Sequence, residues 1–589
     1  MLLPLLVSAW WQGPSPQTSW EPSGRKLPAS WSTLDIEGGT VQDIFYLGQD
    51  TVVAAAWPNL WVSVDGGASW QELRYILFDV SHGTADPYYN AILLFRDDSV
   101  LERSTDLGQS WDTVLISPML HVRFTKPPVS YNGLIYLVGL DTTGGDTLKV
   151  YSSTDGGANW SFEGATEMSL EDIFEVTYSP VWGLLLLMSA ETSDSVVLLI
   201  STDGGSSWSS FLSAPKDSLK RYHVALHPLD ASTIFVAAVS QDFFGVGSWL
   251  RVTNDGGINW STIDTNKVVN FLWADASKLY MGTSIPEGLK HFSLTDYADT
   301  GWGFVDEAVL GLTYDGANLY LATAGLGVLK GFPGSFSEVN SGLRAVWSQS
   351  PFAFASVGDT LFVLDGTSGR VYRSTDGGAS WERLSVNMVY DAYEGMVPAM
   401  SVEAVGSKVW VPGFSISVSP PGLFTLFMSS DGGESWQTQS FPFAPLIINI
   451  DAVDADTLYA YGTLFDYGSG VYKSPDGGVG WTNVLSYPFY LFEGFIPWPH
   501  VAVRAADEVY FVDTAGVRLS TDGGNTWEYL PEYPFPVWRT AVNDTYLLAS
   551  VTDEDEGSID SAGIWAWNGV AWQQAVSYTH LTLPTTERV

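Results

Sequence analysis

Aromatic side chains that lie beside carboxylates in the second half of the chain are the strongest candidates for a functional site. Aromatic rings stack on sugar faces or extended peptides, and nearby charged groups direct hydrogen bonds to the same ligand. We therefore predict a ligand-binding surface made of Asp391, Tyr393, Glu394, Tyr490, Glu493, Trp498, Tyr533, Trp538 and Arg539. The alternative is that these rings pack inside the fold, because burial of apolar area selects the same residue types.

Other candidate chemistries fail on spacing or composition. His223 and His227 are four residues apart, but the segment around them is typical of a strand that runs into a turn, where this spacing does not converge two imidazoles. The acidic run 553–556 lacks the pattern of a calcium-binding loop. The chain contains no Cys, which excludes disulfides, zinc–thiolate sites and thiol catalysis. We predict no metal ion and no cofactor.

Charge limits the possible partners. The chain has 26 Lys and Arg against 66 Asp and Glu, a formal net charge of −40. Such a polyanion repels nucleic acid and anionic membranes. No apolar run reaches the length of a membrane span. We therefore expect no nucleic-acid partner and no transmembrane segment.

A repeated eight-residue pattern, Ser-x-Asp-x-Gly-x-x-Trp, predicts the turns and strands that position these residues. We call this pattern the box. Nine copies occur, one with Thr in place of Ser. Their aspartates are Asp65, Asp106, Asp155, Asp203, Asp255, Asp376, Asp431, Asp476 and Asp522. Asp and Ser side chains bond to local backbone N–H groups, Gly supplies a positive φ, and Trp opens the next strand. Turn chemistry thus accounts for each residue type, and we interpret the nine aspartates as structural.

On these residues the chain resembles the Asp-box, or BNR, repeat proteins, which include sialidases, sortilins, xyloglucanase-type glycosidases and photosystem II assembly-factor-like proteins. The resemblance covers roughly residues 40–575. It implies four-stranded β-propeller blades, with each box joining the two outer strands on the face away from the ligand. Sialidases of this family carry an Arg-Ile-Pro motif that is absent here, so we do not expect sialidase activity.

The spacing of the boxes predicts the number of blades. Neighbouring box tryptophans lie 41 to 55 residues apart, except for a step of 121 between Trp260 and Trp381 that has room for two box-less units, 265–306 and 307–342. A last degenerate unit covers 531–575. We predict an all-β fold of about twelve four-stranded antiparallel blades in two tandem propellers, residues 40–342 with about seven blades and 343–575 with about five. A six-plus-six division is the alternative.

The two ends differ from the repeats. Residues 1–9 resemble the end of a signal peptide, and 29–34 resemble a strand that closes a propeller ring, within a leading segment 1–39. Residues 576–589 resemble the translation of a sequencing adapter, so we expect that the natural chain differs there. From these features we expect a bacterial protein that is secreted, periplasmic or on the cell surface, and monomeric.

The function that fits best is recognition without catalysis, with a glycan or a protein surface bound on the face opposite the boxes. The first alternative is a glycoside hydrolase with its site between two propellers, and the second is an assembly factor for a protein complex. Whether the protein is an enzyme stays open at this point, because no catalytic residue can be matched to the motifs of the glycosidases.

Overall fold

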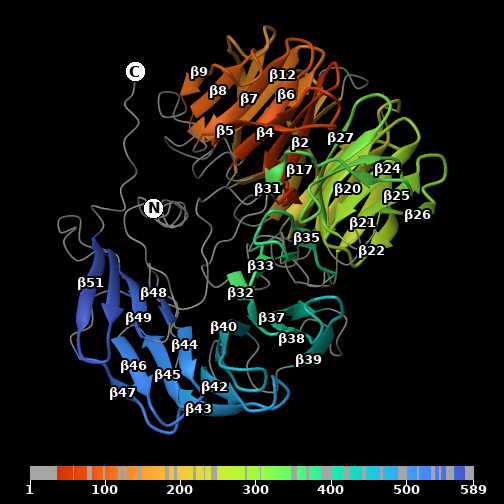
Figure 1. Cartoon of the computed structure of the whole chain (residues 1–589). Coiled ribbons are helices and arrows are strands. Elements are labelled where there is room, and N and C mark those ends of the chain that lie inside the picture. Colours follow the sequence, from red (N-terminus) through yellow and green to blue (C-terminus); the bar gives the residue numbers. More distant parts are fainter. Residues whose placement is uncertain are drawn as a thin grey trace. The chain divides into compact units, whose positions relative to one another are not determined.

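The structure is a computed structural model. It describes residues 36–345 and 354–577, apart from 57–58, 76–82, 97–99, 117–121, 124–128, 142–146, 171, 180–184, 192–194, 216–220, 231, 240–247, 285–287, 305–306, 366–369, 386–400, 416–422, 441–445, 464–468, 488–499, 514–515, 532–536, 543–544 and 552–562. Every regular element in this part is a β-strand (Figure 1). It contains no helix long and apolar enough to cross a membrane.

The strands form twelve consecutive antiparallel sheets, which we call blades 1–12 in chain order. Blades 1–7 are formed by β2 (Asp43–Gly48), β3 (Thr51–Ala56), β4 (Asn59–Ser63) and β5 (Gln71–Tyr75); β6 (Gly83–Asp86), β7 (Ala91–Arg96), β8 (Val100–Ser104) and β9 (Asp112–Ile116); β10 (Val122–Arg123), β11 (Val129–Tyr131), β12 (Leu134–Asp141), β13 (Thr147–Ser153) and β14 (Ser161–Ser169); β15 (Asp172–Ser179), β16 (Leu185–Glu191), β17 (Ser195–Ser201) and β18 (Ser209–Pro215); β19 (Arg221–Leu226), β20 (Ile234–Val239), β21 (Trp249–Thr253) and β22 (Ser261–Thr265); β23 (Val269–Ala274), β24 (Lys278–Thr283), β25 (Leu289–Ser293) and β26 (Asp299–Phe304); and β27 (Val309–Tyr314), β28 (Leu319–Thr323), β29 (Val328–Gly331) and β30 (Ser337–Glu338).

Blades 8–12 follow the same plan. They are formed by β32 (Phe354–Val357), β33 (Thr360–Leu364), β34 (Val371–Ser374) and β35 (Glu382–Arg383); β36 (Glu403–Val405), β37 (Lys408–Ser415), β38 (Leu423–Ser429) and β39 (Gln437–Ser440); β40 (Leu446–Ala452), β41 (Leu458–Thr463), β42 (Gly470–Ser474) and β43 (Thr482–Ser486); β44 (His500–Ala505), β45 (Glu508–Asp513), β46 (Gly516–Ser520) and β47 (Glu528–Tyr529); and β48 (Val537–Val542), β49 (Leu547–Val551), β50 (Gly563–Trp567) and β51 (Trp572–Ser577). The prediction of an all-β fold with about twelve four-stranded propeller blades is confirmed. Val576 and Ser577, which the sequence set apart from the fold, form the end of β51.

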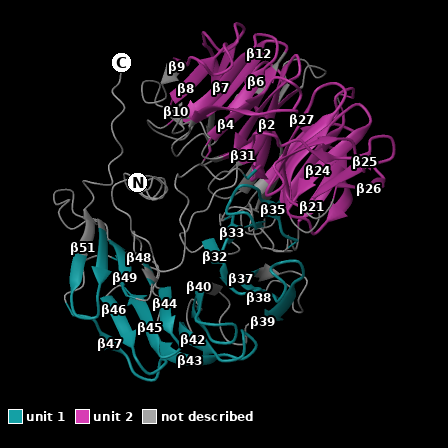
Figure 2. Cartoon of the chain, in the orientation of Figure 1, with its two compact units in different colours: residues 1–36, 347–390, 396–589 teal, residues 37–346, 391–395 magenta. Residues whose placement is uncertain are grey.

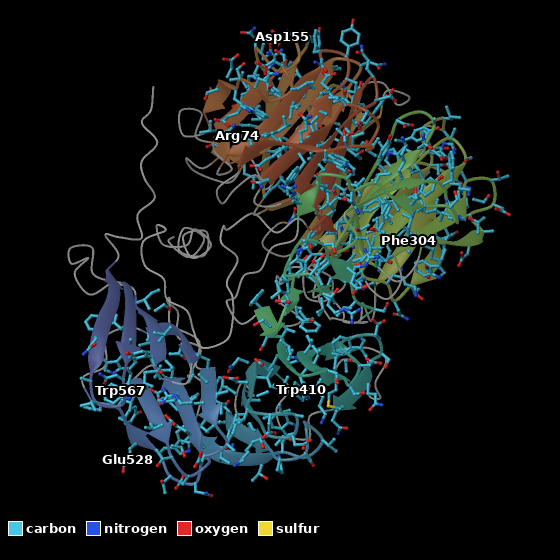
Figure 3. All side chains as sticks on the ribbon, viewed as in Figure 1. Arg74, Asp155, Phe304, Trp410, Glu528 and Trp567 are labelled. Atoms are coloured by element: carbon cyan, nitrogen blue, oxygen red, sulfur yellow. The ribbon has the colours of Figure 1, made fainter. Side chains whose placement is uncertain are left out.

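Burial decreases from the second to the fourth strand of a blade, and this explains why the second strand is apolar and the fourth is polar. The second strand is apolar along its length, and β20 is buried at all six positions. Such a strand is covered on both faces by neighbouring sheets, so it does not alternate apolar with polar residues. The fourth strand forms the outer edge and is mostly exposed, as in β22. Trp410 and Trp567 are accordingly buried between sheets, whereas Glu528 on a fourth strand is exposed and Asp155 in a box is half-buried (Figure 3).

The chain divides into two compact units (Figure 2). One contains residues 37–346 and 391–395 with blades 1–7, and we call it the seven-blade unit. The other contains residues 1–36, 347–390 and 396–589 with blades 8–12, and we call it the five-blade unit. In each unit the first strands of consecutive blades contact one another, so the first strand is the innermost of its blade.

The seven-blade unit is closed by contacts between blade 1 and blade 7. The innermost strands β2 and β27 contact each other, and β1 (Gly38–Gly39) pairs in parallel with β31 (Arg344–Ala345). Val41 N–H donates to the carbonyl of Thr323 at 2.9 Å. The four strands of each of these blades come from consecutive chain segments, so closure joins distant residues without exchanging a strand. The predicted closing strand 29–34 lies outside the described residues.

Candidate functional site

The predicted aromatic surface falls almost wholly outside the described part of the structure. Trp538 and Arg539 lie in β48, although their side chains are outside the description. The other predicted ligand residues are outside it altogether: Asp391, Tyr393, Glu394, Tyr490, Glu493, Trp498 and Tyr533. This surface therefore stays a prediction. The acidic run 553–556 also lies outside the described residues.

The described inner strands carry polar residues at one matched position, which we call the rung. The box Ser or Thr, at the end of the third strand, pairs with one residue of the second strand. Three positions further along that second strand is the residue that pairs with the rung residue on the first strand. In the five blades with a box whose inner strand is described as paired at this position, the register selects Asp43, Glu175, His223, Asn449 and His500. They come from blades 1, 4, 5, 10 and 11, so the same level of both units is polar.

Three of the five rung side chains, those of Glu175, Asn449 and His500, hydrogen-bond to the innermost strand of the next blade. Asn449 donates to the carbonyl of Val501 at 2.7 Å and accepts from Val501 N–H at 2.9 Å. His500 Nε2 lies 2.9 Å from Thr540 Oγ1. Each bond reaches the residue after the next blade's rung, so the same register places Arg539, a predicted ligand residue, at the rung of blade 12.

These bonds have a backbone cause. The innermost strand is the edge of its own sheet, so its outward N–H and C=O groups have no strand partner. Buried backbone groups need a hydrogen bond, and a polar side chain from the neighbouring blade provides it. Glu175, Asn449 and His500 each join two blades in this way.

Two carboxyl groups on inner strands have perturbed acidity. Burial raises the pKa of Asp43 to about 7, although Ile44 N–H donates to its Oδ1 at 2.8 Å. Burial likewise raises the pKa of Asp451 to about 7, against the bond from Val503 N–H to Oδ2 at 2.8 Å. Both side chains keep some exposed area, yet neighbouring protein atoms remove much of their hydration. Near neutral pH these groups exchange protons, which suits acid–base chemistry or hydrogen-bond donation to a ligand.

His223 and Glu175 form a carboxylate–imidazole pair between blades 4 and 5. Nδ1 of His223 lies 3.0 Å from Oε2 of Glu175, which also accepts from Val224 N–H at 3.3 Å. The carboxylate favours the proton on Nδ1 and leaves the lone pair on Nε2. His227 instead accepts N–H bonds from Leu229 and Asp230, each at 3.1 Å. The two histidines therefore serve different neighbours, and the described residues contain no group of three or more acidic, His or Cys side chains placed to hold a metal ion.

Sequence reasoning missed the rung. The signal that could have revealed it is a single polar residue inside an otherwise apolar inner strand, such as Asn449 within β40. One such residue is indistinguishable from the polar half of an alternating strand. The rung becomes visible only when the box in each blade fixes the register.

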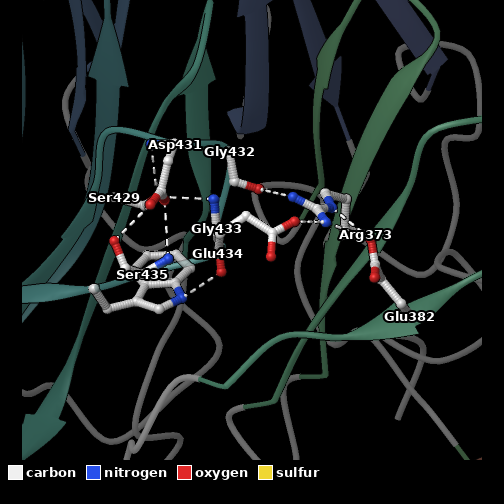
Figure 4. Close-up of polar contacts among 9 residues, drawn as sticks. Arg373, Glu382, Ser429, Asp431, Gly432, Gly433, Glu434 and Ser435 are labelled. Carbon is white, nitrogen blue, oxygen red and sulfur yellow. Dashed lines mark hydrogen bonds and ion pairs between the residues drawn. The ribbon is translucent and has the colours of Figure 1, made fainter.

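The nine boxes all connect the third and fourth strands of their blades. In blade 9 (Figure 4) the Ser429 hydroxyl donates to Asp431 Oδ1 at 2.7 Å and accepts from Gly433 N–H at 2.7 Å. Asp431 accepts from the N–H of Ser435 at 2.9 Å and from its hydroxyl at 2.5 Å. The Ser435 hydroxyl bond is the largest cause that lowers the pKa of Asp431 to about 2. In blade 2, Leu107 replaces the first Gly and still adopts a φ of 58°.

The first Gly of a box also accepts a bond from the preceding blade, which we call the clasp. Arg373 of blade 8 donates to the carbonyl of Gly432 at 2.6 Å and pairs with Glu382 and Glu434 (Figure 4). Lys330 of blade 7 donates to the carbonyl of Gly66 in blade 1 at 2.8 Å. The seven-blade unit is thus closed by the same contact that joins consecutive blades elsewhere.

No protein-family model matches the sequence, and no curated protein matches it either. Solved structures resemble it. An ancestral GH74 enzyme is 14% identical, covers 92% of this chain and 84% of that chain, and superposes with a TM-score of 0.57. The GH74 xyloglucanase from Xanthomonas campestris is 16% identical over 93% of this chain and 95% of that one, with a TM-score of 0.35. YCF48 from Cyanidioschyzon merolae is 15% identical over 50% and 96%, with a TM-score of 0.37. At these identities the likeness to the ancestral GH74 enzyme establishes that the chain shares its β-propeller fold.

Proposed function

We propose that this chain is a carbohydrate-recognition protein that binds a glycan without cleaving it. The observation that carries the proposal is the likeness to an ancestral GH74 enzyme, which extends over 92% of the chain and therefore over both units. Enzymes of glycoside hydrolase family 74 act on carbohydrate, so the shared architecture favours a carbohydrate ligand. Binding is favoured over cleavage because Glu175, a carboxylate of the described inner strands, already accepts a backbone N–H bond from the neighbouring blade and pairs with His223.

The binding surface in this proposal is the set of aromatic residues that the sequence predicts. Their segments precede the innermost strands of blades 9, 11 and 12 in the sequence, and Trp538 and Arg539 lie in β48 itself. An aromatic ring next to a carboxylate or guanidinium stacks on a sugar and fixes its hydroxyl groups. The half-buried rung residues Asp43, Glu175 and His223 add polar groups on the inner strands of the seven-blade unit.

We infer in addition that the nine turns are Asp boxes of the BNR type and serve the fold alone. This is supported by their constant place between the third and fourth strands and by their bonds, which stay within the box or clasp the neighbouring blade. A secreted, periplasmic or cell-surface location in a bacterium completes the proposal, supported by the signal-like residues 1–9.

A glycan array and a pull-down on insoluble polysaccharides, both with the full chain, test the proposal. We expect binding of at least one polysaccharide, and a loss of about fivefold in affinity for Tyr490→Ala and for Trp538→Ala, since one stacked ring contributes roughly 1 kcal/mol. Tyr88→Ala is the matched control, because Tyr88 is 68% exposed in the β6–β7 turn of blade 2. Absence of glycan binding, or equal binding by all three variants and the unchanged protein, would contradict the proposal.

Glycoside hydrolysis is a second candidate, favoured by one residue. Asp43 has a pKa of about 7, so it is largely protonated in mildly acidic solution and could protonate a glycosidic oxygen. The test is release of reducing ends from the polysaccharides that bind. If the chain cleaves them, Asp43→Asn should lower kcat at least a hundredfold at unchanged affinity. Cleavage that survives this substitution would exclude Asp43 as the acid.

A further inference from the structure

Eight of the nine boxes contain the dipeptide Asp-Gly, and two Asn-Gly dipeptides, Asn132-Gly133 and Asn568-Gly569, lie in turns of blades 3 and 12. The main-chain nitrogen of a Gly can attack the side-chain carbonyl carbon of the Asp or Asn before it, because Gly has no Cβ to hinder the approach. The product is a five-membered succinimide ring. Its hydrolysis leaves aspartate or isoaspartate, in which the main chain runs through the former side chain. The turns of this protein differ in whether they permit that attack.

The box protects its Asp-Gly dipeptide in two ways. In blade 8, Gly377 N–H donates to the carbonyl of Asp359 in the β32–β33 turn at 3.0 Å, so the attacking nitrogen is held by another bond. The boxes of blades 1, 5, 9, 10 and 11 make the same bond to the turn between their first and second strands. The hydroxyl bond from Ser380 is the largest cause that lowers the pKa of Asp376 to about 2, so its carboxylate is ionised. An ionised carboxylate is a poor electrophile, because attack would add a second negative charge to it.

The β50–β51 turn of blade 12 also joins a third strand to a fourth, but it lacks both protections. Gly569 is exposed, and its N–H has no hydrogen-bond partner in the described part of the chain. Asn568 is exposed as well, and its uncharged amide is a better electrophile than a carboxylate. Its Oδ1 accepts N–H bonds from Val570 at 2.9 Å and from Ala571 at 3.0 Å. These two donors stabilise the negative charge that develops on Oδ1 when Cγ is attacked, as the donors of an oxyanion hole do.

The β11–β12 turn of blade 3 contains the same dipeptide in a covered position. Gly133 is buried, and a Cβ added to it would lie 2.7 Å from Tyr88 Cδ1 and 2.8 Å from Tyr89 Cε2 of blade 2. The main chain must rotate before the nitrogen can reach the side chain, and the two rings leave no room for this rotation. Asn132 and Asn568 therefore compare a covered and an open Asn-Gly turn within one chain.

We propose that Asn568 is a site of spontaneous covalent modification in the folded protein, where a succinimide forms and opens to aspartate or isoaspartate. The Gly569 nitrogen forms a bond to Cγ of Asn568, and the Cγ–Nδ2 bond breaks. Nδ2 leaves as ammonia, which takes the proton of the attacking N–H. Water then adds to one of the two ring carbonyls and breaks its bond to the ring nitrogen. Addition at Cγ gives aspartate, and addition at the main-chain carbonyl carbon gives isoaspartate.

Isoaspartate alters the turn more than aspartate does, because it adds one methylene to the main chain. The turn connects Trp567, which is buried, to its cross-strand partner Trp572, and their ring centroids lie 5.7 Å apart. A longer main chain at this point shifts the two strands against each other, so isoaspartate should weaken the outer strand pair of blade 12. The proposal concerns the chemistry of this turn and is independent of the proposed glycan binding.

Peptide mapping by mass spectrometry, after incubation of the full chain at pH 8, tests the proposal. The same chain in concentrated guanidinium chloride is the unfolded reference, so the effect of the local sequence cancels for each site. We expect Asn568 to react in the folded protein within about threefold of its unfolded rate, because no opening of the structure is needed. Asn132 should react at least about tenfold more slowly than in the unfolded chain, since opening a covered turn costs more than about 1.4 kcal/mol.

Asn568→Asp is the matched variant. The Asp side chain can accept the same two N–H bonds and leaves the main chain unchanged, but it is ionised at pH 8, as the box aspartates are. We expect it to form isoaspartate at least about tenfold more slowly than the unchanged chain. An Asn568 that is protected by folding as strongly as Asn132 would overturn the proposal. Isoaspartate that appears in Asn568→Asp as fast as in the unchanged chain would overturn it as well.

Discussion

At the scale of single residues, the box distinguishes a buried bond from an exposed one. The Ser429 hydroxyl is buried and holds both Asp431 and the Gly433 N–H, whereas the Ser435 hydroxyl meets the same Asp431 at the exposed end of the turn. A buried donor that loses its partner costs far more than an exposed one, because water cannot replace the bond.

We therefore expect Ser429→Ala to lower the free energy of unfolding of the five-blade unit by about 1–3 kcal/mol. Ser435→Ala should change it by less than about 0.5 kcal/mol, because water takes its place. Urea denaturation followed by tryptophan fluorescence measures both. Equal losses for the two variants would show that the Gly433 N–H bond to Ser429 does not matter.

The raised pKa of Asp43 predicts how the stability of the folded protein depends on pH. Its pKa is raised by burial from 3.8 to about 7, so above pH 4 the unfolded chain loses this proton while the folded protein keeps it. The folded state then binds more protons, and stability falls as pH rises from about 4 to 7. The full shift corresponds to at most about 4 kcal/mol, and about 2 kcal/mol is reasonable for a side chain with some exposed area.

Asp43→Asn keeps the shape and the acceptor for Ile44 N–H but cannot ionise. Relative to the unchanged protein, we expect the variant to be about 2 kcal/mol more stable at pH 8 and close to equal at pH 4. Thermal unfolding at a series of pH values shows the difference. A difference that is constant with pH would mean that Asp43 titrates normally in the folded protein.

At the scale of elements, the clasp between blades 8 and 9 combines one part-buried bond with two ion pairs whose acidic partners are exposed. Arg373 Nη1 donates to the carbonyl of Gly432 at 2.6 Å. Its acidic partners Glu382 and Glu434 have side chains that are 55% and 66% exposed, so solvent screens both pairs. The bond to the carbonyl should therefore dominate the contribution of the clasp.

From this we expect Arg373→Met to destabilise the five-blade unit by about 1–3 kcal/mol, because the Gly432 carbonyl loses a charged donor. Glu434→Gln, the matched test of the ion pair, should cost less than about 0.5 kcal/mol. Chemical denaturation at low and high salt compares them. If Glu434→Gln lowers the free energy of unfolding as much as Arg373→Met does, and this loss disappears in high salt, the ion pair rather than the carbonyl bond stabilises the clasp.

At the scale of the whole molecule, the two units differ in how their blades are supported. Each blade of the seven-blade unit has an apolar cluster on both sides, whereas blades 8 and 12 each have one cluster among the described residues. Propeller blades are stabilised largely by their neighbours, as are other stacked repeats. The five-blade unit should therefore unfold first.

Differential scanning calorimetry should show two transitions. Lys330 clasps Gly66 at the closure of the seven-blade unit, and Lys473 lies 3.4 Å from the carbonyl of Gly523 in the five-blade unit. We expect Lys330→Met to lower only the higher transition, and Lys473→Met only the lower one, each by a few degrees for a loss of roughly 1 kcal/mol. A single transition that both variants shift equally would mean that the two units unfold together.

The sequence by itself determined the all-β class, the repeat and the twelve four-stranded units. Its box contains the bonds of its own turn within eight residues, as Ser429, Asp431 and Ser435 show, so local chemistry was sufficient to locate nine third-to-fourth strand connections. The ligand surface around Tyr490 and Trp538 stays a prediction from the sequence.

Only the tertiary structure decided which blades meet and what their inner strands carry. The rung bonds of Glu175 and Asn449 join residues about 50 positions apart, and Val41 meets Thr323 across nearly the whole seven-blade unit. Nothing local in the chain encodes such contacts, because side chains of neighbouring sheets come together only when the blades are stacked.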